Sequence, residues 1–402
     1  MSAGKRTDEH GYGRTGLNGT MEMPIYLDHN ATTPVDRNVL EKMLPYFCEV
    51  YGNAASIDHI HGNKAKQAVD EARQAIAKVL GCRKESEIVF TSGATESINL
   101  ALIGAFRRFK DKGNHIISSA IEHPAVLDTL NYLQSEGAEI TRLPVDRNGV
   151  VDLEVLEKSI KKDTILISVM FANNEIGTIQ PIKEIGALAK SKGIIFHTDA
   201  AQAVGHEKIN VYDLNIDLLS FSAHKFYGPK GIGGLFVRSY SPLIKLSPIS
   251  FGGGHEKGMR SGTLNVPGIV GMAEALSLSI KEMSYENNRL RKAAGVICQR
   301  LQQTFPDIKL NGHPQNRLAH NLSLTIPGVE AKALIHRLKN RLSFSTGSAC
   351  STIKVEPSHV LKAIGLADDE TFQTVRLGLG RTTQGAAGIA DILIDGVNHV
   401  RK

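Results

Sequence analysis

The sequence predicts an α/β fold in which helices wrap a largely parallel sheet. Two alternating periods carry this prediction: short apolar runs of strand length are separated by stretches with apolar residues at helical spacing. Strands that alternate with helices in this way form parallel sheets with helices on both faces. The chain has 402 residues, 42% of them hydrophobic, and is therefore long enough for one large core and a second, smaller one.

The elements of the large part can be assigned in order. Residues 64–80 place apolar side chains at helical spacing, and Gly81 is a natural helix end. Apolar runs of strand length follow at residues 87–91, 115–119, 139–145, 164–172, 193–198, 217–222 and 234–237. We expect each run to form a strand of the central sheet.

The composition changes after the glycines at residues 252–254. A long helical stretch begins at Val266, and strand-like runs fill the sequence from about His320 onward, which predicts a second α+β domain. We expect a large domain of residues 38–279, a small domain of residues 23–37 and 280–402, and a disordered extension of residues 1–22.

Charge and hydropathy restrict the partners. The formal charge of +6 comes from interspersed side chains and not from a basic run, so we expect no direct nucleic-acid partner. Apolar runs are too short for a membrane span, and the first 22 residues lack the apolar stretch of a signal peptide. The four cysteines are scattered, which favours reduced thiols over a metal site or disulfides. We therefore expect a cytoplasmic protein without a bound metal.

Polar clusters follow five of the predicted strands. In an open α/β sheet, ligands bind beyond the carboxyl ends of the strands, where such clusters would meet. One cluster alone is more often a turn or a helix cap, but five on one edge predict a built site. They lie at residues 92–96, 121–124, 173–175, 199–202 and 222–225.

The chemistry of these clusters favours one cofactor. Residues 92–95 lead from a strand into a helix, whose free N–H groups attract an anion, yet the sequence has neither a Walker-type loop nor a dinucleotide fingerprint. A lysine, Lys225, and an acid, Asp199, end neighbouring strands, and this set suits pyridoxal phosphate (PLP). Lys225 would form the Schiff base, and Asp199 would keep the pyridine nitrogen protonated. The phosphate would contact Ala94, Thr95, Ser222 and His224.

Motifs along the whole chain support this interpretation. They lie at residues 26–34, 90–97, 172–177, 197–202, 222–231, 260–263 and 347–350. Together they resemble the cysteine desulfurases of the NifS/IscS type, within the class V aminotransferase-like PLP enzymes of fold type I. The resemblance runs from about Pro24 to the end, and it implies a large domain with a mostly parallel seven-stranded sheet and a smaller α+β domain.

The resemblance also implies roles for individual residues. Beside Lys225 and Asp199, it assigns Gln202 to the phenolic oxygen of the cofactor and His123 to stacking on its ring. Asn174 would be a further residue of the cofactor site. Asn174 and Asn30 would lie near the substrate carboxylate. Arg376 would bind that carboxylate in a fork geometry that lysine cannot form. Thr263 would reach the cofactor phosphate of the other subunit, which implies a homodimer. One departure is visible, because Gly378 stands where the family usually has serine.

Cys350 is the candidate nucleophile. A cysteine among small residues is by itself more often an inert packing group. Here the surrounding glycine and serines favour a mobile loop, and Pro357, seven residues later, resembles the long-loop desulfurases that pass sulfur to acceptor proteins. Cys48, Cys82 and Cys298 match no motif and are interpreted as structural.

The implied reaction starts from L-cysteine. Lys225 moves the Cα proton, His123 exchanges a proton with sulfur, and the Cys350 thiolate takes the sulfur as a persulfide while alanine departs. The acceptor would be a sulfur-acceptor or iron–sulfur scaffold protein, or a thiolation pathway. The alternatives are an aminotransferase or selenocysteine lyase on the same scaffold and, outside enzymes, a sulfur- or metal-binding scaffold.

Overall fold

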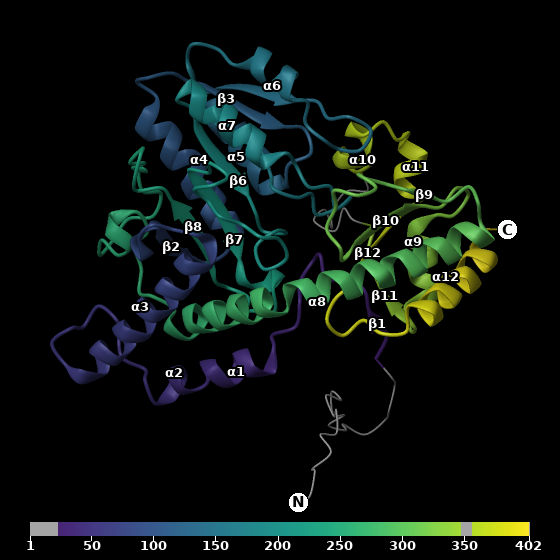
Figure 1. Cartoon of the computed structure of the whole chain (residues 1–402), viewed down its shortest axis with the longest axis horizontal. Coiled ribbons are helices and arrows are strands. Elements are labelled where there is room, and N and C mark those ends of the chain that lie inside the picture. Colours follow the sequence, from purple (N-terminus) through teal and green to yellow (C-terminus); the bar gives the residue numbers. More distant parts are fainter. Residues whose placement is uncertain (1–22, 347–355, 402) are drawn as a thin grey trace, which may run out of the picture.

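The computed structural model describes residues 23–346 and 356–401, and its main element is a seven-stranded sheet (Figure 1). Along the sheet the strand order is β2-β8-β7-β6-β5-β3-β4. β8 is antiparallel to both of its neighbours, and the other neighbouring strands are parallel, which confirms the predicted sheet. The strands are β2 (Ile88–Thr91), β3 (His115–Ser119), β4 (Glu139–Leu143), β5 (Thr164–Ser168), β6 (Ile195–Asp199), β7 (Leu218–Ser222) and β8 (Gly233–Val237).

Each of the seven strands lies within or next to its predicted run, and the largest difference in length is at β5. β5 ends at Ser168, whereas the apolar run continues to residue 172. Beyond the strand the chain folds back on itself, and Gln180 donates its backbone N–H to the carbonyl of Phe171 at 2.9 Å. Val169 and Phe171 still donate their backbone N–H groups to the carbonyls of His197 and Asp199 in β6, so the chain stays beside the sheet and its apolar side chains are buried there.

Helices cover both faces of the large sheet. α3 ends at Gly81, whose φ of 69° suits glycine, as the sequence predicts. The long helix predicted from Val266 is present as α8. The helices of this part are α1 (Arg37–Met43), α2 (Pro45–Cys48), α3 (Ile60–Leu80), α4 (Ala94–Phe109), α5 (Pro124–Ser135), α6 (Leu153–Ser159), α7 (Ile182–Lys192) and α8 (Val266–Thr304).

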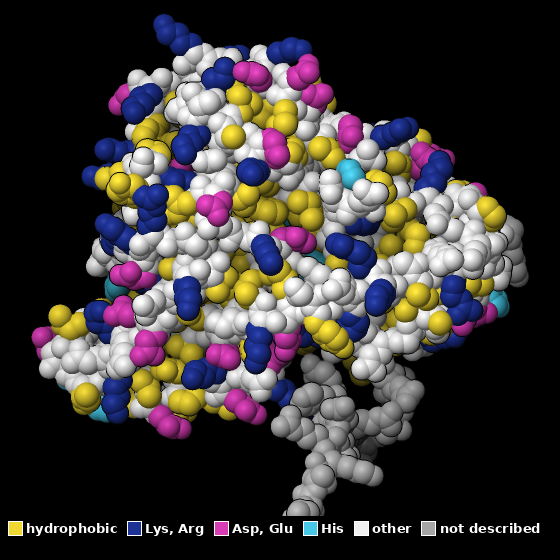
Figure 2. All heavy atoms as spheres, viewed as in Figure 1, with side chains coloured by type: hydrophobic (Ala, Val, Ile, Leu, Met, Phe, Trp, Pro, Cys, Tyr) yellow, Lys and Arg dark blue, Asp and Glu magenta, His cyan; other side chains and the backbone are white. Residues whose placement is uncertain are grey.

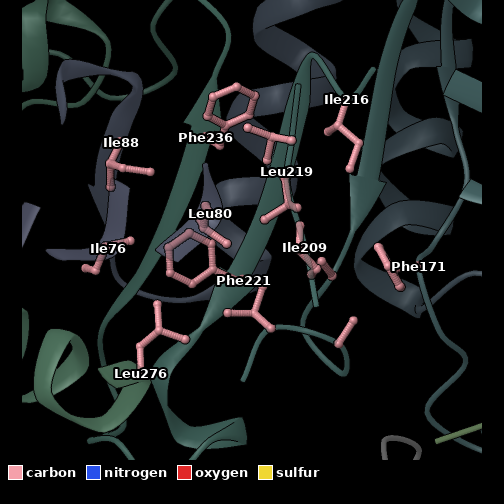
Figure 3. Close-up of a cluster of buried hydrophobic side chains, with 14 of the residues drawn as sticks. Ile76, Leu80, Ile88, Phe171, Ile209, Ile216, Leu219, Phe221, Phe236 and Leu276 are labelled. Atoms are coloured by element: carbon pink, nitrogen blue, oxygen red, sulfur yellow. The ribbon is translucent and has the colours of Figure 1, made fainter. Parts of the chain in front are cut away.

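Alternate strand residues enter two separate cores. Leu219 and Phe236 pack in a cluster with residues of α3, α7 and α8, while their sequence neighbours Leu218 and Leu235 pack with residues of α4 and α5. This alternation is the period of a sheet buried on both faces. Figure 3 shows the first cluster, where Phe221 and Leu276 meet Ile76 and Leu80.

A smaller α+β part, which except for β1 follows the large sheet in the sequence, lies at the other end of α8 (Figure 1). Its core joins the C-terminal half of α8 to a three-stranded sheet in the order β12-β10-β9 and to a β1-β11 pair. The elements are β1 (Ile25–Tyr26), β9 (Lys309–Leu310), β10 (Asn321–Thr325), α9 (Ala331–Leu338), β11 (Leu342–Ser343), α10 (His359–Ala363), α11 (Asp368–Phe372), β12 (Thr374–Gly378) and α12 (Ala386–Val400).

Two features of the expected organisation need qualification. α8 runs unbroken through the predicted boundary at residues 279–280, so the division into domains stays a prediction. The expected extension at residues 1–22 lies outside the described residues. Among the described helices, none combines the length and the apolar character that crossing a bilayer requires.

Candidate active site

A cavity of about 590 Å³ opens at the carboxyl ends of the parallel strands. It is bordered on one side by the strand-end turns of the large sheet and on the other by residues of the smaller part. Thr263 is exposed and does not line it, and Cys350 lies outside the described residues. The cavity brings together all the other predicted site residues: Asn30, Ala94, Thr95, His123, Asn174, Asp199, Gln202, Ser222, His224, Lys225 and Arg376.

One end of the cavity is built to hold an anion. Ala94 and Thr95 form the first turn of α4, where backbone N–H groups have no partner within the helix. Ser222 and His224 line the cavity from the end of β7 and the turn that follows. Burial and the nearby Lys225 lower the pKa of His224 to about 4, so at neutral pH its ring is an uncharged hydrogen-bonding group.

Lys225 projects into the cavity toward the turn after β1. Its Nζ donates to the carbonyl oxygens of Asn30 at 2.7 Å and Ala31 at 2.8 Å. The side chains of Asn30 and Gln202 bond to each other, and Gln202 Nε2 also donates to the Asn30 carbonyl at 2.9 Å. Asn30 Oδ1 is buried against Gly378 and accepts no hydrogen bond within the described residues.

Asp199 ends β6, His123 lies in the turn between β3 and α5, and both face the cavity. Asp199 is 4% exposed, its Oδ1 accepts the Ala201 N–H at 2.9 Å, and burial raises its pKa. A cation in the cavity would therefore bind this carboxylate strongly. His123 caps α5 by accepting the Ala125 N–H at Nδ1, and burial lowers its pKa, which leaves the proton of the neutral ring on Nε2. His123 thus both caps α5 and lines the cavity, so the two interpretations of its cluster hold together.

Arg376 enters the cavity from β12 and is nearly fully buried. One Nη pairs with Asp28 Oδ1 at 2.8 Å and the other donates to the backbone carbonyl of Asn174 at 3.0 Å. Ser345 also bonds to Asp28 through its hydroxyl and pairs with the Arg376 backbone. These contacts fix the guanidinium at the cavity wall, where a carboxylate could bind it.

The glycine that departs from the family pattern has a local reason. A Cβ at Gly378 would lie 2.6 Å from Asn30 Oδ1 and 2.7 Å from the backbone nitrogens of His29 and Asn30. Serine at this position would require the turn that carries Asn30 to move. Glycine therefore preserves the contact between β12 and the residues that bond Lys225.

Several residues of the site region are not singled out by the sequence. Asp28 orients Arg376, and Thr32 and Lys230 line the cavity. All three lie within motifs quoted above, which is the only signal that could have found them. Glu122 and Glu175 belong to the predicted polar clusters, but both are buried in hydrogen bonds behind the cavity, to Ser119 and Ser358 respectively.

Comparison with known proteins agrees with this geometry. Residues 25–386 match the family model described as "Aminotransferase class-V", so the chain belongs to the class-V aminotransferase family. A curated relative from Dechloromonas aromatica (strain RCB), named "Cysteine desulfurase IscS", is 48% identical over 368 residues, covering 90% of this chain and 89% of the relative. These findings confirm the predicted family.

Solved structures give the same result. A chain described as "NIFS-LIKE PROTEIN" superposes with a TM-score of 0.85 at 36% identity and covers 94% of this chain and 98% of its own length. Another, described as "SspA in complex with cysteine", has a TM-score of 0.75 at 38% identity and covers 88% of this chain and 98% of that chain. The likeness confirms the PLP-enzyme fold of type I predicted for the chain.

Proposed function

We propose that the chain is a PLP-dependent cysteine desulfurase, which takes sulfur from L-cysteine, releases L-alanine and keeps the sulfur as a persulfide on Cys350. The observation that carries this proposal is the convergence of Lys225, Asp199, the start of α4 and Arg376 on one cavity. The relative and the solved structure named above, a cysteine desulfurase and a protein in complex with cysteine, support the choice of substrate.

The residues present fit PLP. The phosphate would be held by Ala94, Thr95, Ser222 and His224, and the ring by His123, Asp199 and Gln202, with Asn174 beside it. The raised pKa of the buried Asp199 carboxylate fits a group that pairs with a ring cation. When bound through Lys225, PLP supplies an electron sink for charge that develops at the substrate Cα.

The side chains of the site supply binding and proton transfer. Arg376 would bind the substrate carboxylate at one end of the cavity, near Asn30, and the Lys225 amine would move the Cα proton. As the Cys350 thiolate bonds to the substrate sulfur, the electron pair of the carbon–sulfur bond would stay with carbon, which takes up a proton to complete the methyl group of alanine. The neutral His123, with its proton on Nε2, could supply that proton. The described residues on either side of the Cys350 segment, Ser345 and Ser358, both bond to residues of the site region.

The surface supports a homodimer. Phe251 is 79% exposed, and further large hydrophobic side chains are exposed on Leu44, Phe47, Tyr51, Ile57 and Ile60. Figure 2 shows hydrophobic side chains at the surface over α1, α2 and the turn before α3. Apolar patches of this kind mark association sites. Thr263 is exposed in one chain, as expected if it serves the partner's cofactor.

An acceptor protein, such as an iron–sulfur scaffold, would receive the persulfide sulfur, and the cytoplasm is the proposed setting. The test is an assay of alanine and sulfide from L-cysteine, followed by mass spectrometry for a 32 Da addition on Cys350, roughly the mass of one sulfur atom. We expect Cys350→Ala to abolish sulfur transfer while the absorbance of bound PLP persists, and Lys225→Ala to abolish both. Unchanged sulfur transfer in Cys350→Ala would overturn the nucleophile assignment. The alternative, an aminotransferase, would need no thiol, so its reaction would not depend on Cys350.

A further inference from the structure

A second cavity, of about 700 Å³, lies between the C-terminal half of α8 and the segment from Leu310 to Leu322. None of its lining residues lines the active-site cavity. Its volume is within the range of small-molecule sites. The proposed desulfurase reaction uses no residue of this cavity, so its construction calls for a separate explanation.

The charge of this second cavity is one-sided. Arg291 and Arg317 line it, and no aspartate or glutamate does. Arg317 is 8% exposed and donates to the backbone carbonyls of Asn311 at 3.0 Å and Asn321 at 3.1 Å. Within the described residues, no carboxylate oxygen lies within 4.0 Å of its guanidinium. Burial lowers the pKa of Arg317 to about 10, so it remains a cation at neutral pH.

A buried cation without a carboxylate is costly, and an anion in the cavity would offset that cost. The other polar side chains of the wall are uncharged amides, which can bond an anion or its polar substituents. Leu310, Leu318 and Leu322 give the same cavity an apolar surface. The wall thus offers the positive charges of the buried Arg317 and the exposed Arg291 beside an apolar floor.

A glycine in the C-terminal half of α8, Gly295, leaves this space open. A Cβ at Gly295 would meet no atom within 4 Å, so packing does not require glycine there. By contrast, a Cβ at Gly268 or Gly271, in the same helix, would lie 2.5 Å from Asn265 Nδ2 or Met43 Sδ. Glycine inside a helix costs about 1 kcal/mol relative to alanine. At Gly295 no packing contact compensates for this cost, and the absence of a side chain leaves room for a ligand at the wall.

We propose that the cavity beside α8 is a second binding site, which takes a small organic anion with an apolar part. Its anionic group, a carboxylate or a phosphate, pairs with Arg317, and its apolar part lies along Leu310 and Leu318. The ligand approaches the backbone of α8 at Gly295.

Hexanoate is a suitable probe, with hexylamine and hexanol as cationic and neutral probes of equal chain length. Isothermal titration calorimetry on the PLP-loaded enzyme should show saturable binding of hexanoate and at least tenfold weaker binding of the other two. Gly295→Phe fills the cavity from a position where a side chain has room, and should weaken hexanoate binding at least tenfold. The matched control is Gly388→Phe in α12, another exposed helical glycine whose Cβ would meet no atom within 4 Å and which lines neither cavity.

The outcomes separate this site from the active site, which also holds an arginine. If hexanoate binds Gly295→Phe as it binds the unaltered enzyme and L-alanine displaces it, the anion occupies the active-site cavity and the proposal is wrong. Equal binding of hexanoate and hexylamine would also overturn it. Arg317→Met provides the charge test, with circular dichroism to establish that it is folded. If this variant unfolds, Gly295→Phe alone decides.

Discussion

The active-site cavity and the cavity beside α8 are similar in size and built by different means. The active-site cavity gathers strand-end turns, a helix start and β12, and its wall holds both cations and anions, including Lys225, Arg376 and Asp199. The cavity beside α8 is formed by one helix face and one loop, and its charged side chains are arginines. Opposite charges around a reacting molecule can move protons and stabilise changing charge, whereas a one-signed wall only binds.

The largest expected effect is on the acid of the active site. Asp199→Asn removes the carboxylate that would hold the ring nitrogen protonated, so kcat/KM for L-cysteine should fall roughly 10²- to 10³-fold. Gly295→Phe, in the other cavity, should leave the same quantity within about twofold, because it touches no residue of the active site. Steady-state alanine production measures kcat/KM in both variants. Equal losses of kcat/KM in the two variants would mean that the cavities do not differ in function as proposed.

A smaller effect is expected at the substrate end. Arg376→Lys keeps the charge but cannot bond Asp28, the Asn174 carbonyl and a substrate carboxylate in one fork. KM for L-cysteine should rise about 10- to 100-fold with a much smaller change in kcat. Initial rates over a range of cysteine concentrations measure this split. A KM that stays unchanged would place the substrate carboxylate elsewhere.

Acid should affect the stability of the fold through His197, near the active site, but should not affect binding in the cavity beside α8. His197, in β6 below the active site, bonds the hydroxyls of Ser168 and Ser220, and burial lowers its pKa to about 3. Because this pKa is below the unfolded value of about 6.5, the folded state loses stability as pH falls below about 6.5, by about 2 kcal/mol between pH 7.5 and 5.0. Arg317 does not titrate in that range, so hexanoate binding should stay constant from pH 6 to 8.

Urea unfolding checks the histidine effect against a variant without the titrating ring. His197→Asn should destabilise the protein less at pH 5.0 than at pH 7.5, by about the same 2 kcal/mol, since asparagine carries no acid penalty. An equal destabilisation at both pH values would mean that His197 is not held neutral in the fold.

The smallest expected effect is on the free energy of unfolding, and it should have opposite signs at two glycines of α8. Gly295→Ala should raise the free energy of unfolding by about 1 kcal/mol, because alanine favours the helix and the added methyl has room. Gly271→Ala should lower it by about 1 to 3 kcal/mol, because the methyl would lie 2.5 Å from Met43 Sδ. Thermal or urea unfolding measures both. Destabilisation by Gly295→Ala would mean that packing requires this glycine after all.

Much of the fold and the active site could be predicted from the sequence, for a physical reason. Strands buried on both faces give continuous apolar runs, and the turns after them must carry the polar groups, so Asp199 and Lys225 stand out against their neighbours. The end of β5 was missed because the residues after Ser168 are also apolar and buried and still bond to β6, so the sequence shows no change there.

Contacts between distant segments could not be predicted in the same way. Asp28 and Arg376 are 348 residues apart in sequence, and only the fold brings them to 2.8 Å. The helix residues of the cavity beside α8 give no sequence signal, because Arg291 and the glutamines of α8 are spaced like those of any solvated helix face. Cys298 was interpreted as structural, yet it lines that cavity.

The most direct test of the central claim locates the cofactor on the chain. The enzyme is loaded with PLP, reduced with borohydride and digested, and the peptides are analysed by mass spectrometry. The account predicts a phosphopyridoxyl group on Lys225, at the cavity where Asp199 and the start of α4 meet. Labelling of Lys230 instead, or of no lysine, would contradict it.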